Sequence, residues 1–337
     1  MRSLLTALLL ASVTTTLATT LGACADAQPG TPPQAAASAE MSSSAQHVLE
    51  TFTSDSAGFD THSFWLDTGR EVVVFDAQFT EGLANQLIAE IHAKTKSPIR
   101  FVVVTHPNPD KFNGASAFQA IGAKVIASES TAKAIPGVYA YKKYYFVNVA
   151  KSFTDATYPA QAKIDLTFNG DFELPLAGSF KVKLHELAHA GVSTTQTVAF
   201  VPSMNALVVG DVVHHKAHAW LEGGIAFGKP VPDLASWKLA LEELRAYTGA
   251  TVYGGRGQTA LVDDAVSAEE SYLDRINALI TSYVAGLGPA KSELSGPNAG
   301  DHYKKIAALA AQEFPDFALP YMIEYGAYGL INQIAAR

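Results

Sequence analysis

The residues suited to chemistry in this chain first appear in a short loop that follows an apolar run. The loop reads His106-Pro107-Asn108-Pro109-Asp110-Lys111 and comes directly after Phe101-Val102-Val103-Val104-Thr105. Imidazole nitrogens and carboxylate oxygens are common zinc ligands, so this pattern is typical of a metal-ligand loop at a strand end. Lys111 does not suit such a loop, because a charged ammonium has no lone pair to donate.

Three later segments carry similar side chains at the ends of predicted strands. His189 lies in Ala188-His189-Ala190-Gly191, Asp211 follows Val209-Gly210, and Arg256 lies in Tyr253-Gly254-Gly255-Arg256-Gly257. Each of these segments therefore places a potential ligand or a charged side chain at the end of a predicted strand.

The order and spacing of these segments resemble the metallo-β-lactamase superfamily over about residues 46–258. In that family the first loop reads Thr-His-x-His-x-Asp-His, a later His follows a strand, an Asp ends a Gly-Asp strand, and a last His occupies a Gly-His-Gly turn. The corresponding positions here are Thr105, His106, Asn108, Asp110, Lys111, His189, Asp211 and Arg256. The resemblance implies a four-layer αβ/βα sandwich, with residues 259–337 as a helical C-terminal extension.

The family's metal ligands can be carried over residue by residue. The resemblance implies a first metal site made of His106, His189 and Asp211, with Asn108 as a weak neutral ligand. The second site keeps only Asp110 and Asp211, because Lys111 and Arg256 stand where the family has imidazoles.

Lys111 and Arg256 place two positive charges where the family holds a divalent ion. At an effective dielectric constant of about 20, a unit charge about 4 Å from such an ion is repelled by roughly 8 kcal/mol. The sequence therefore predicts one zinc ion at most, with the two cations taking the electrostatic place of the other.

Two functions follow from this pattern. In the first, the chain is an atypical hydrolase of a small molecule, in which one zinc ion activates water. Asp110 then orients the nucleophile, and Lys111 or Arg256 binds an anionic group of the substrate or a developing oxyanion. In the second, it is a metal-free binding protein that recognises an anionic ligand through Lys111 and Arg256. Hydrolysis of β-lactams does not follow from the resemblance.

His185-Glu186-Leu187-Ala188-His189 also fits the H-E-x-x-H zinc-peptidase pattern, which requires a helix. The alternation of Phe180 to Leu184 favours a strand instead, and a third histidine is absent at the spacing that related peptidases use. A second histidine cluster, His214, His215 and His218, is expected either in a solvated loop or as a substitute for a lost ligand.

Hydrophobic periodicity predicts the elements that carry these loops. In the first half we expect strands over 71–76, 101–105, 122–127 and 145–149, with a helix after the N-cap Thr80. In the second half we expect strands over 180–184, 197–201, 206–209 and 250–253, and a helix capped by Asp233. Ser267 and Glu270 are expected to form a capping box, followed by a last helix over about 303–314.

The N-terminus has the pattern of an export signal. Arg2 is followed by an apolar stretch that ends in Leu21-Gly22-Ala23-Cys24, which resembles a bacterial lipobox. We expect residues 1–23 to be removed and a lipid on Cys24 to anchor the protein in the cell envelope, facing the periplasm. Residues 24–45 are then expected to form a flexible linker. The alternative is an ordinary signal peptide that is cut nearby. The single cysteine excludes an internal disulfide, and the net charge of −8 does not favour nucleic-acid binding.

Overall fold

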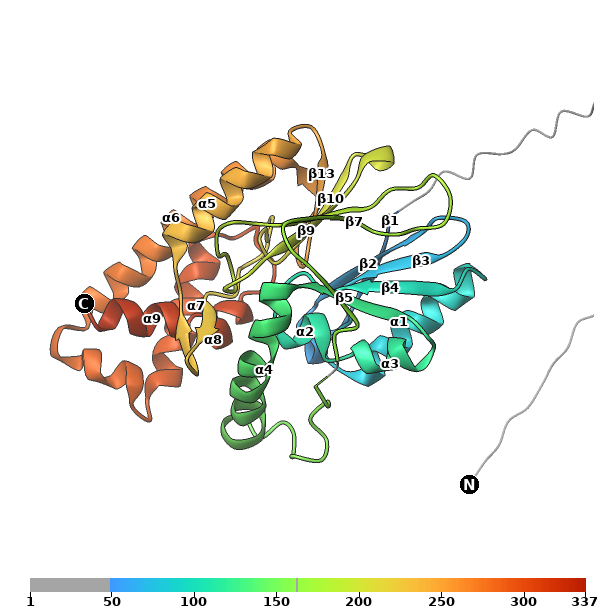
Figure 1. Ribbon diagram of the computed structural model, residues 1–337. Coiled ribbons are helices and arrows are strands. Elements are labelled where there is room, and N and C mark those ends of the chain that lie inside the picture. Colours follow the sequence, from blue (N-terminus) through green and yellow to red (C-terminus); the bar gives the residue numbers. More distant parts are fainter. Residues whose placement is uncertain (1–48, 162) are drawn as a thin grey trace, which may run out of the picture. The chain divides into compact units, whose positions relative to one another are not determined.

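A computed structural model describes residues 49–161 and 163–337 of the chain, which belong to one compact unit (Figure 1). The predicted signal peptide, the lipid on Cys24 and the linker lie outside the described residues and stay predictions. Within the described part, no helix is both long and apolar enough to cross a membrane.

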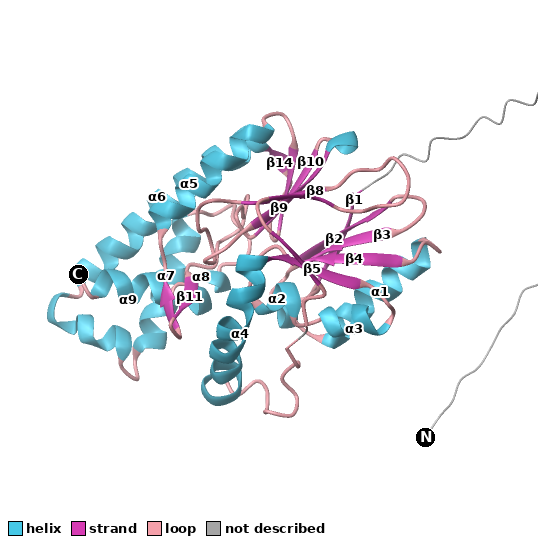
Figure 2. Cartoon of the chain, viewed as in Figure 1, coloured by secondary structure: helices cyan, strands magenta, loops and turns pink. Residues whose placement is uncertain are grey.

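Two sheets, each of six described strands, form the centre of this unit (Figure 2). The first has the order β1-β2-β3-β4-β5-β6 and comprises β1 (Leu49–Thr53), β2 (His62–Asp67), β3 (Val72–Phe75), β4 (Ile99–Val103), β5 (Lys124–Ser128) and β6 (Leu166–Phe168). The second has the order β14-β13-β10-β9-β8-β7 and comprises β7 (Asp171–Glu173), β8 (Lys183–Glu186), β9 (Thr197–Val201), β10 (Ala206–Gly210), β13 (Thr251–Gly254) and β14 (Ala260–Leu261). A separate ribbon pairs β11 (Gly224–Ala226) with β12 (Lys229–Val231).

Helices cover the outer face of each sheet. The first sheet carries α1 (Glu81–Lys94), α2 (Pro109–Phe112), α3 (Ala115–Ala120) and α4 (Glu129–Tyr144). The second carries α5 (Leu234–Glu243) and α6 (Val262–Gly286). Beyond them, α7 (Ala299–Glu313) and α9 (Tyr328–Ala335) pack against α6, and α8 (Tyr321–Gly326) contacts both α7 and α9. Short 3₁₀ segments occupy Ser56–Gly58, Pro202–Met204, Leu244–Tyr247 and Gly288–Ser295.

Alternating side chains of each strand hold these layers together. In β3, Val73 and Phe75 enter the core between the two sheets, where they join Val208 of the second sheet. Val74 of the same strand faces the other way and packs with Leu87 of α1. This alternation follows from the two-residue period of a strand, and it confirms the predicted four-layer αβ/βα sandwich with a helical C-terminal region.

Local capping signals fix two helix starts as predicted. Thr80 Oγ1 accepts a hydrogen bond from Leu83 N at 3.2 Å at the start of α1. Asp233 Oδ1 accepts one from Ser236 N at 2.9 Å at the start of α5. Each cap satisfies an amide that has no partner inside the helix.

Three predicted elements differ in the structure. α6 begins at Val262, so Ser267 lies inside the helix and the expected capping box does not form. Residues Tyr145–Val149 continue α4 as a π-helical turn instead of forming a strand. After Pro320 the chain forms α8 and α9, which lie beyond the last helix that the sequence analysis predicts.

Candidate functional site

The carboxyl ends of β4, β10 and β13 bring five predicted site residues together. β4 leads into the loop with His106 and into α2, which carries Asp110 and Lys111. Asp211 follows β10 and Arg256 follows β13, and these two strands are parallel neighbours. The structure thus places side by side five of the residues that the family resemblance assigns to one site.

The turn after β13 passes very close to this group. A Cβ atom on Gly255 would collide with Asp211 Oδ1 and would lie 2.9 Å from Lys111 Nζ. Only glycine lets the backbone approach the two charged groups so closely.

Lys111 is a buried cation between two carboxylates. Its Nζ lies 3.0 Å from Asp110 Oδ2 and 2.9 Å from Asp211 Oδ1, and its side chain has no exposed surface. Burial lowers the pKa of Lys111, but the two carboxylates raise it by more, so the pKa lies above its ordinary value. The ammonium is therefore charged at neutral pH.

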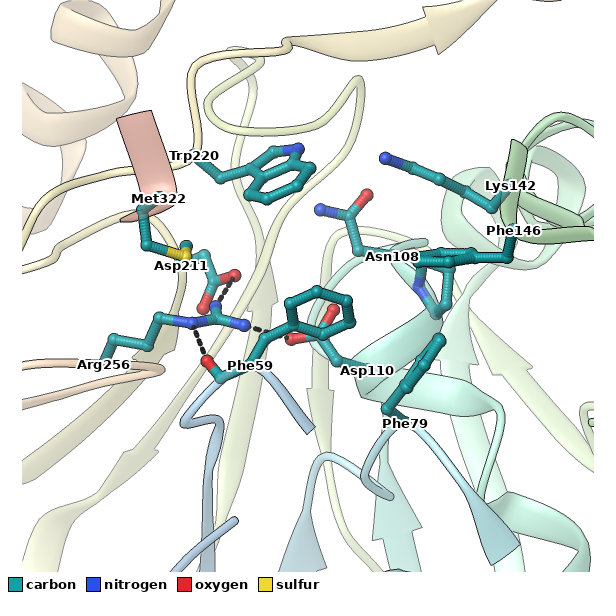
Figure 3. Close-up of a pocket in the computed structure, with 11 residues that line it drawn as sticks. Phe59, Phe79, Asn108, Asp110, Lys142, Phe146, Asp211, Trp220, Arg256 and Met322 are labelled. Atoms are coloured by element: carbon teal, nitrogen blue, oxygen red, sulfur yellow. Dashed lines mark hydrogen bonds and ion pairs between the residues drawn. The ribbon is translucent and has the colours of Figure 1, made fainter. Parts of the chain in front are cut away.

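Arg256 bonds through each nitrogen of its guanidinium group. Nη1 donates to Asp211 Oδ2 at 2.6 Å, and Nη2 donates to Asp110 Oδ2 at 3.0 Å (Figure 3). Nη2 also donates to Thr61 Oγ1, and Nε donates to the carbonyl oxygen of Phe59, both at 2.8 Å. We call Asp110, Lys111, Asp211 and Arg256 the ion-pair cluster.

The cluster keeps both aspartates ionised despite burial. Burial raises the pKa of Asp110, but Lys111 and Arg256 lower it to about 2. The same two cations hold the pKa of Asp211 well below its usual range. Two carboxylates and two cations therefore balance each other in formal charge.

Asp76 adds a carboxyl that the sequence analysis did not single out. Its Oδ1 accepts from Thr105 N and its Oδ2 from Thr105 Oγ1, both at 2.9 Å, and Lys111 Nζ lies 3.9 Å away. Burial raises the pKa of Asp76 to about 7. Its position directly after β3, like that of Asp211 after β10, is the signal that could have identified it.

His106 lies beside the cluster with one ring nitrogen unused. Nδ1 is 3.0 Å from Thr105 Oγ1, whereas the buried Nε2 has no hydrogen-bond partner and lies 3.6 Å from Asp211 Oδ2. Burial lowers the pKa of His106 to about 4, so the ring is neutral at pH 7.

The structure does not bring His189 to this group. Its Nδ1 lies 2.7 Å from Glu243 Oε1, at the end of α5, and the side chain is 42% exposed. Glu243 also accepts the backbone amides of Ala188 and His189, which fixes the whole turn there. The expected ligand set of His106, His189 and Asp211 is therefore not assembled.

The two other histidine patterns are also resolved. His185 and Glu186 lie in β8, as expected. The zinc-peptidase pattern is therefore not on the helix that its chemistry requires. His214 and His218 are buried instead of forming a solvated loop: Glu269 accepts from His214 N at 2.9 Å, and Tyr272 Oη lies 3.2 Å from His218 Nδ1.

A small cleft lies next to the cluster (Figure 3). Its lining consists of Phe59, Phe79, Asn108, Pro109, Asp110, Lys142, Phe146, Asp211, Trp220, Arg256 and Met322. Of the predicted site residues, Asn108, Asp110, Asp211 and Arg256 reach the cleft. Sequence reasoning missed its aromatic wall, because those residues come from segments with no shared motif.

The residues present do not fit the metal centre that the family resemblance implies. Lys111 and Arg256 contact Asp110 Oδ2 and both carboxylate oxygens of Asp211, and His189 pairs with Glu243 instead. Among the described residues, no three His, Cys, Asp or Glu side chains form a group that could hold a metal ion. The chemistry of this donor set is that of an ion-pair network.

Comparison with known proteins agrees with this architecture. Among solved structures, a metallo-beta-lactamase from Pontibacter korlensis is 23% identical, with a TM-score of 0.51 over 67% of this chain and 94% of the other. The metallo-beta-lactamase FIM-1 from Pseudomonas aeruginosa, in a mono-zinc form, is 17% identical, with a TM-score of 0.48 over 64% of this chain and 84% of the other. No match was found among curated proteins.

The likeness to the Pontibacter korlensis structure concerns the fold alone, while the sequence itself identifies the family. The family model described as "Metallo-beta-lactamase superfamily" matches residues 57–256, which is more than half of the chain. The matched range includes every residue of the ion-pair cluster and all strands of the two sheets except the outer strands β1 and β14. This chain therefore belongs to the metallo-beta-lactamase superfamily.

Proposed function

We propose that this member of the superfamily binds a small molecule in its cleft without a metal ion. Membership of the superfamily suggests a hydrolase-like function. The observation that carries our proposal is the position of Lys111 Nζ, within 3.0 Å of Asp110 and Asp211. A cation already occupies the space between the two carboxylates that the family uses for metal.

Charge supports the same conclusion. Lys111 and Arg256 neutralise Asp110 and Asp211, and no carboxylate of this group is left over for a divalent ion. A metal ion about 4 Å from either cation would meet a repulsion of roughly 8 kcal/mol at an effective dielectric constant of about 20.

The two cations are also poorly placed to bind an anionic ligand. Lys111 has no exposed surface, and only 3% of the Arg256 side chain is exposed. Arg256 already donates to two carboxylates, to Thr61 and to Phe59. Their contacts favour a structural role in holding the floor of the cleft, in place of the expected recognition of an anion.

Metal analysis tests this proposal. We expect protein purified without chelator to hold far less than one equivalent of zinc or iron, and its thermal unfolding midpoint to stay unchanged in EDTA. A tightly held equivalent of metal, with a lower midpoint in EDTA, would refute it.

The second candidate is the single-metal hydrolase expected from the sequence. One observation favours it: His106 Nε2 is buried without a hydrogen-bond partner, 3.6 Å from Asp211 Oδ2. This candidate requires hydrolysis of an ester, amide or lactam that is lost together with bound zinc in His106→Ala. Activity that persists in metal-free protein, or zinc that is bound without activity, would exclude it.

A further inference from the structure

The wall of the cleft consists of large apolar side chains from separate parts of the chain. Phe59 precedes β2, Phe79 precedes α1 and Phe146 extends α4, while Trp220 and Met322 come from the C-terminal half. Figure 3 shows these side chains around the cleft, with the Asn108 amide pointing into it. The sequence separation of these residues means that only the fold assembles the wall.

Phe59 packs edge to face against Phe79 and Trp220, which fixes the positions of these three rings relative to one another. The ring centroids of Phe59 and Trp220 are 6.1 Å apart, and those of Phe59 and Phe79 are 5.1 Å apart. Aromatic pairs favour such T-shaped contacts because the ring edge is positive and the ring face negative. The wall is therefore pre-formed on the side of Phe59, Phe79 and Trp220.

Phe59 is anchored at its backbone. It has a left-handed φ of 63°, and its carbonyl oxygen accepts from Arg256 Nε at 2.8 Å. The next residue, Asp60, accepts from Tyr321 Oη at 2.6 Å. The ion-pair cluster and α8 thus hold the same turn from two directions.

The charged groups around the cleft have partners. Asp110, Asp211 and Arg256 pair within the ion-pair cluster, and Lys142 forms a buried ion pair with Glu222. An ionic ligand would have to shed its hydration without a free counter-charge in return, which is costly. Asn108 supplies a neutral amide instead.

The C-terminal helices fix Trp220. A Cβ atom on Gly326, at the end of α8, would lie 2.5 Å from Cδ2 of the Trp220 ring. Trp220 Nε1 donates to Glu222 Oε2 at 2.8 Å, and a Cβ atom on Gly329 of α9 would collide with the backbone of Glu222. Both glycines lie outside the range that matches the family.

From these contacts we propose that the cleft takes a neutral, flat, largely apolar molecule, and that α8 and α9 set its width by holding Trp220 in place. This inference rests on the proposed metal-free binding function and adds the ligand class. The rings of Phe59 and Trp220 contact the apolar part of the ligand, and the Asn108 amide hydrogen-bonds its polar group.

Three probes that differ in charge test the ligand class. Binding of 4-fluorobenzyl alcohol, 4-fluorobenzoate and 4-fluorobenzylamine to the purified protein is measured by fluorine NMR at pH 7, with and without EDTA. We expect the alcohol to bind at least about tenfold more tightly than either ion, equally well in EDTA. Equal or tighter binding of the benzoate or the amine, or no binding of the alcohol, would overturn the inference.

Glycine variants test the role of the C-terminal helices. Gly326→Ala is expected to weaken binding of the alcohol at least about tenfold, because the new methyl group displaces Trp220. Gly300→Ala in α7 is the matched control, since a Cβ atom there meets nothing within 4 Å. Equal affinities of the two variants would refute the positioning role.

Two further measurements keep these outcomes separate. If Gly326→Ala lowers the unfolding midpoint, the variant Trp220→Leu is used in its place and is expected to weaken binding of the alcohol by a similar factor. Unchanged affinity in Trp220→Leu would refute the contact between Trp220 and the ligand. Binding of the alcohol that disappears in EDTA would contradict the metal-free function, whereas a preference for an ion in EDTA contradicts only the ligand class.

Discussion

Lys111 Nζ lies 2.9 Å from Asp211 Oδ1, and both side chains are buried. The two residues come from α2 and from the end of β10, so this ion pair joins the two halves of the sandwich at the floor of the cleft. In the family pattern, the position of Lys111 belongs to a metal-binding histidine. A protein side chain therefore supplies here the positive charge that an ion supplies in that pattern.

Removal of the Lys111 charge should destabilise the fold. In Lys111→Met, two buried carboxylates lose a shared counter-charge, so we expect the free energy of unfolding to fall by about 3–5 kcal/mol. Urea unfolding at pH 7 measures it. Lys124→Met is the control, because Lys124 is 53% exposed and lies 3.6 Å from Asp165; it should cost less than about 1 kcal/mol. Similar losses in both variants would show that the buried pair has no special role.

Arg256 should not be replaceable by lysine. The planar guanidinium reaches Asp211, Asp110 and Phe59 at once, whereas one ammonium cannot serve all three. We expect Arg256→Lys to lower the free energy of unfolding by about 2 kcal/mol or more. The exposed Arg70, which lies in the turn between β2 and β3, provides the control Arg70→Lys, which should change stability little. Wild-type stability in Arg256→Lys would contradict the bridging role.

Acid should destabilise the protein by protonating the aspartates of the ion-pair cluster. The pKa of Asp110 is about 2 in the folded chain, below its ordinary value of 3.8, because Lys111 and Arg256 outweigh the effect of burial. Its stabilisation is present above pH 4 and is lost as pH falls from about 4 to 2, by about 2 kcal/mol in total. Asp211 shifts in the same direction.

Unfolding free energies measured between pH 2 and 5 test this dependence. Asp110→Asn should be less stable than the wild type at pH 7, and its free energy of unfolding should fall less as the pH is lowered. Asp155→Asn serves as the control, since the Asp155 side chain is 85% exposed. If the acid dependence of Asp110→Asn equals that of the wild type, Asp110 is not the group that titrates.

Much of the scaffold was predictable because its signals are local. The β-branched run of β3, the cap at Thr80 and the cap at Asp233 depend on residues only a few positions apart. The grouping of His106, Asp110 and Asp211 at one site was implied by the family resemblance, which rests on motifs that the sequence shows directly. Tyr145–Val149 was mistaken for a strand because its apolar and aromatic residues suit either structure.

The contacts that decide the chemistry were not local. His189 is held by Glu243, which lies 54 residues further along the chain, and no pattern around either residue reveals that pairing. The cleft wall likewise depends on Phe59, Trp220 and Met322, which meet only in the folded chain. The substitution of Lys111 and Arg256 for imidazoles was visible in the sequence, whereas their distances to the carboxylates required the structure.

The most direct test of the account is the zinc content after saturation with zinc and removal of the excess by gel filtration. Wild-type protein should retain far less than one equivalent, because Lys111 and Arg256 occupy the carboxylates of Asp110 and Asp211. Lys111→His/Arg256→His replaces both cations by zinc ligands beside these two carboxylates and should retain about one equivalent. Retention of one or more equivalents by the wild-type protein would contradict the account.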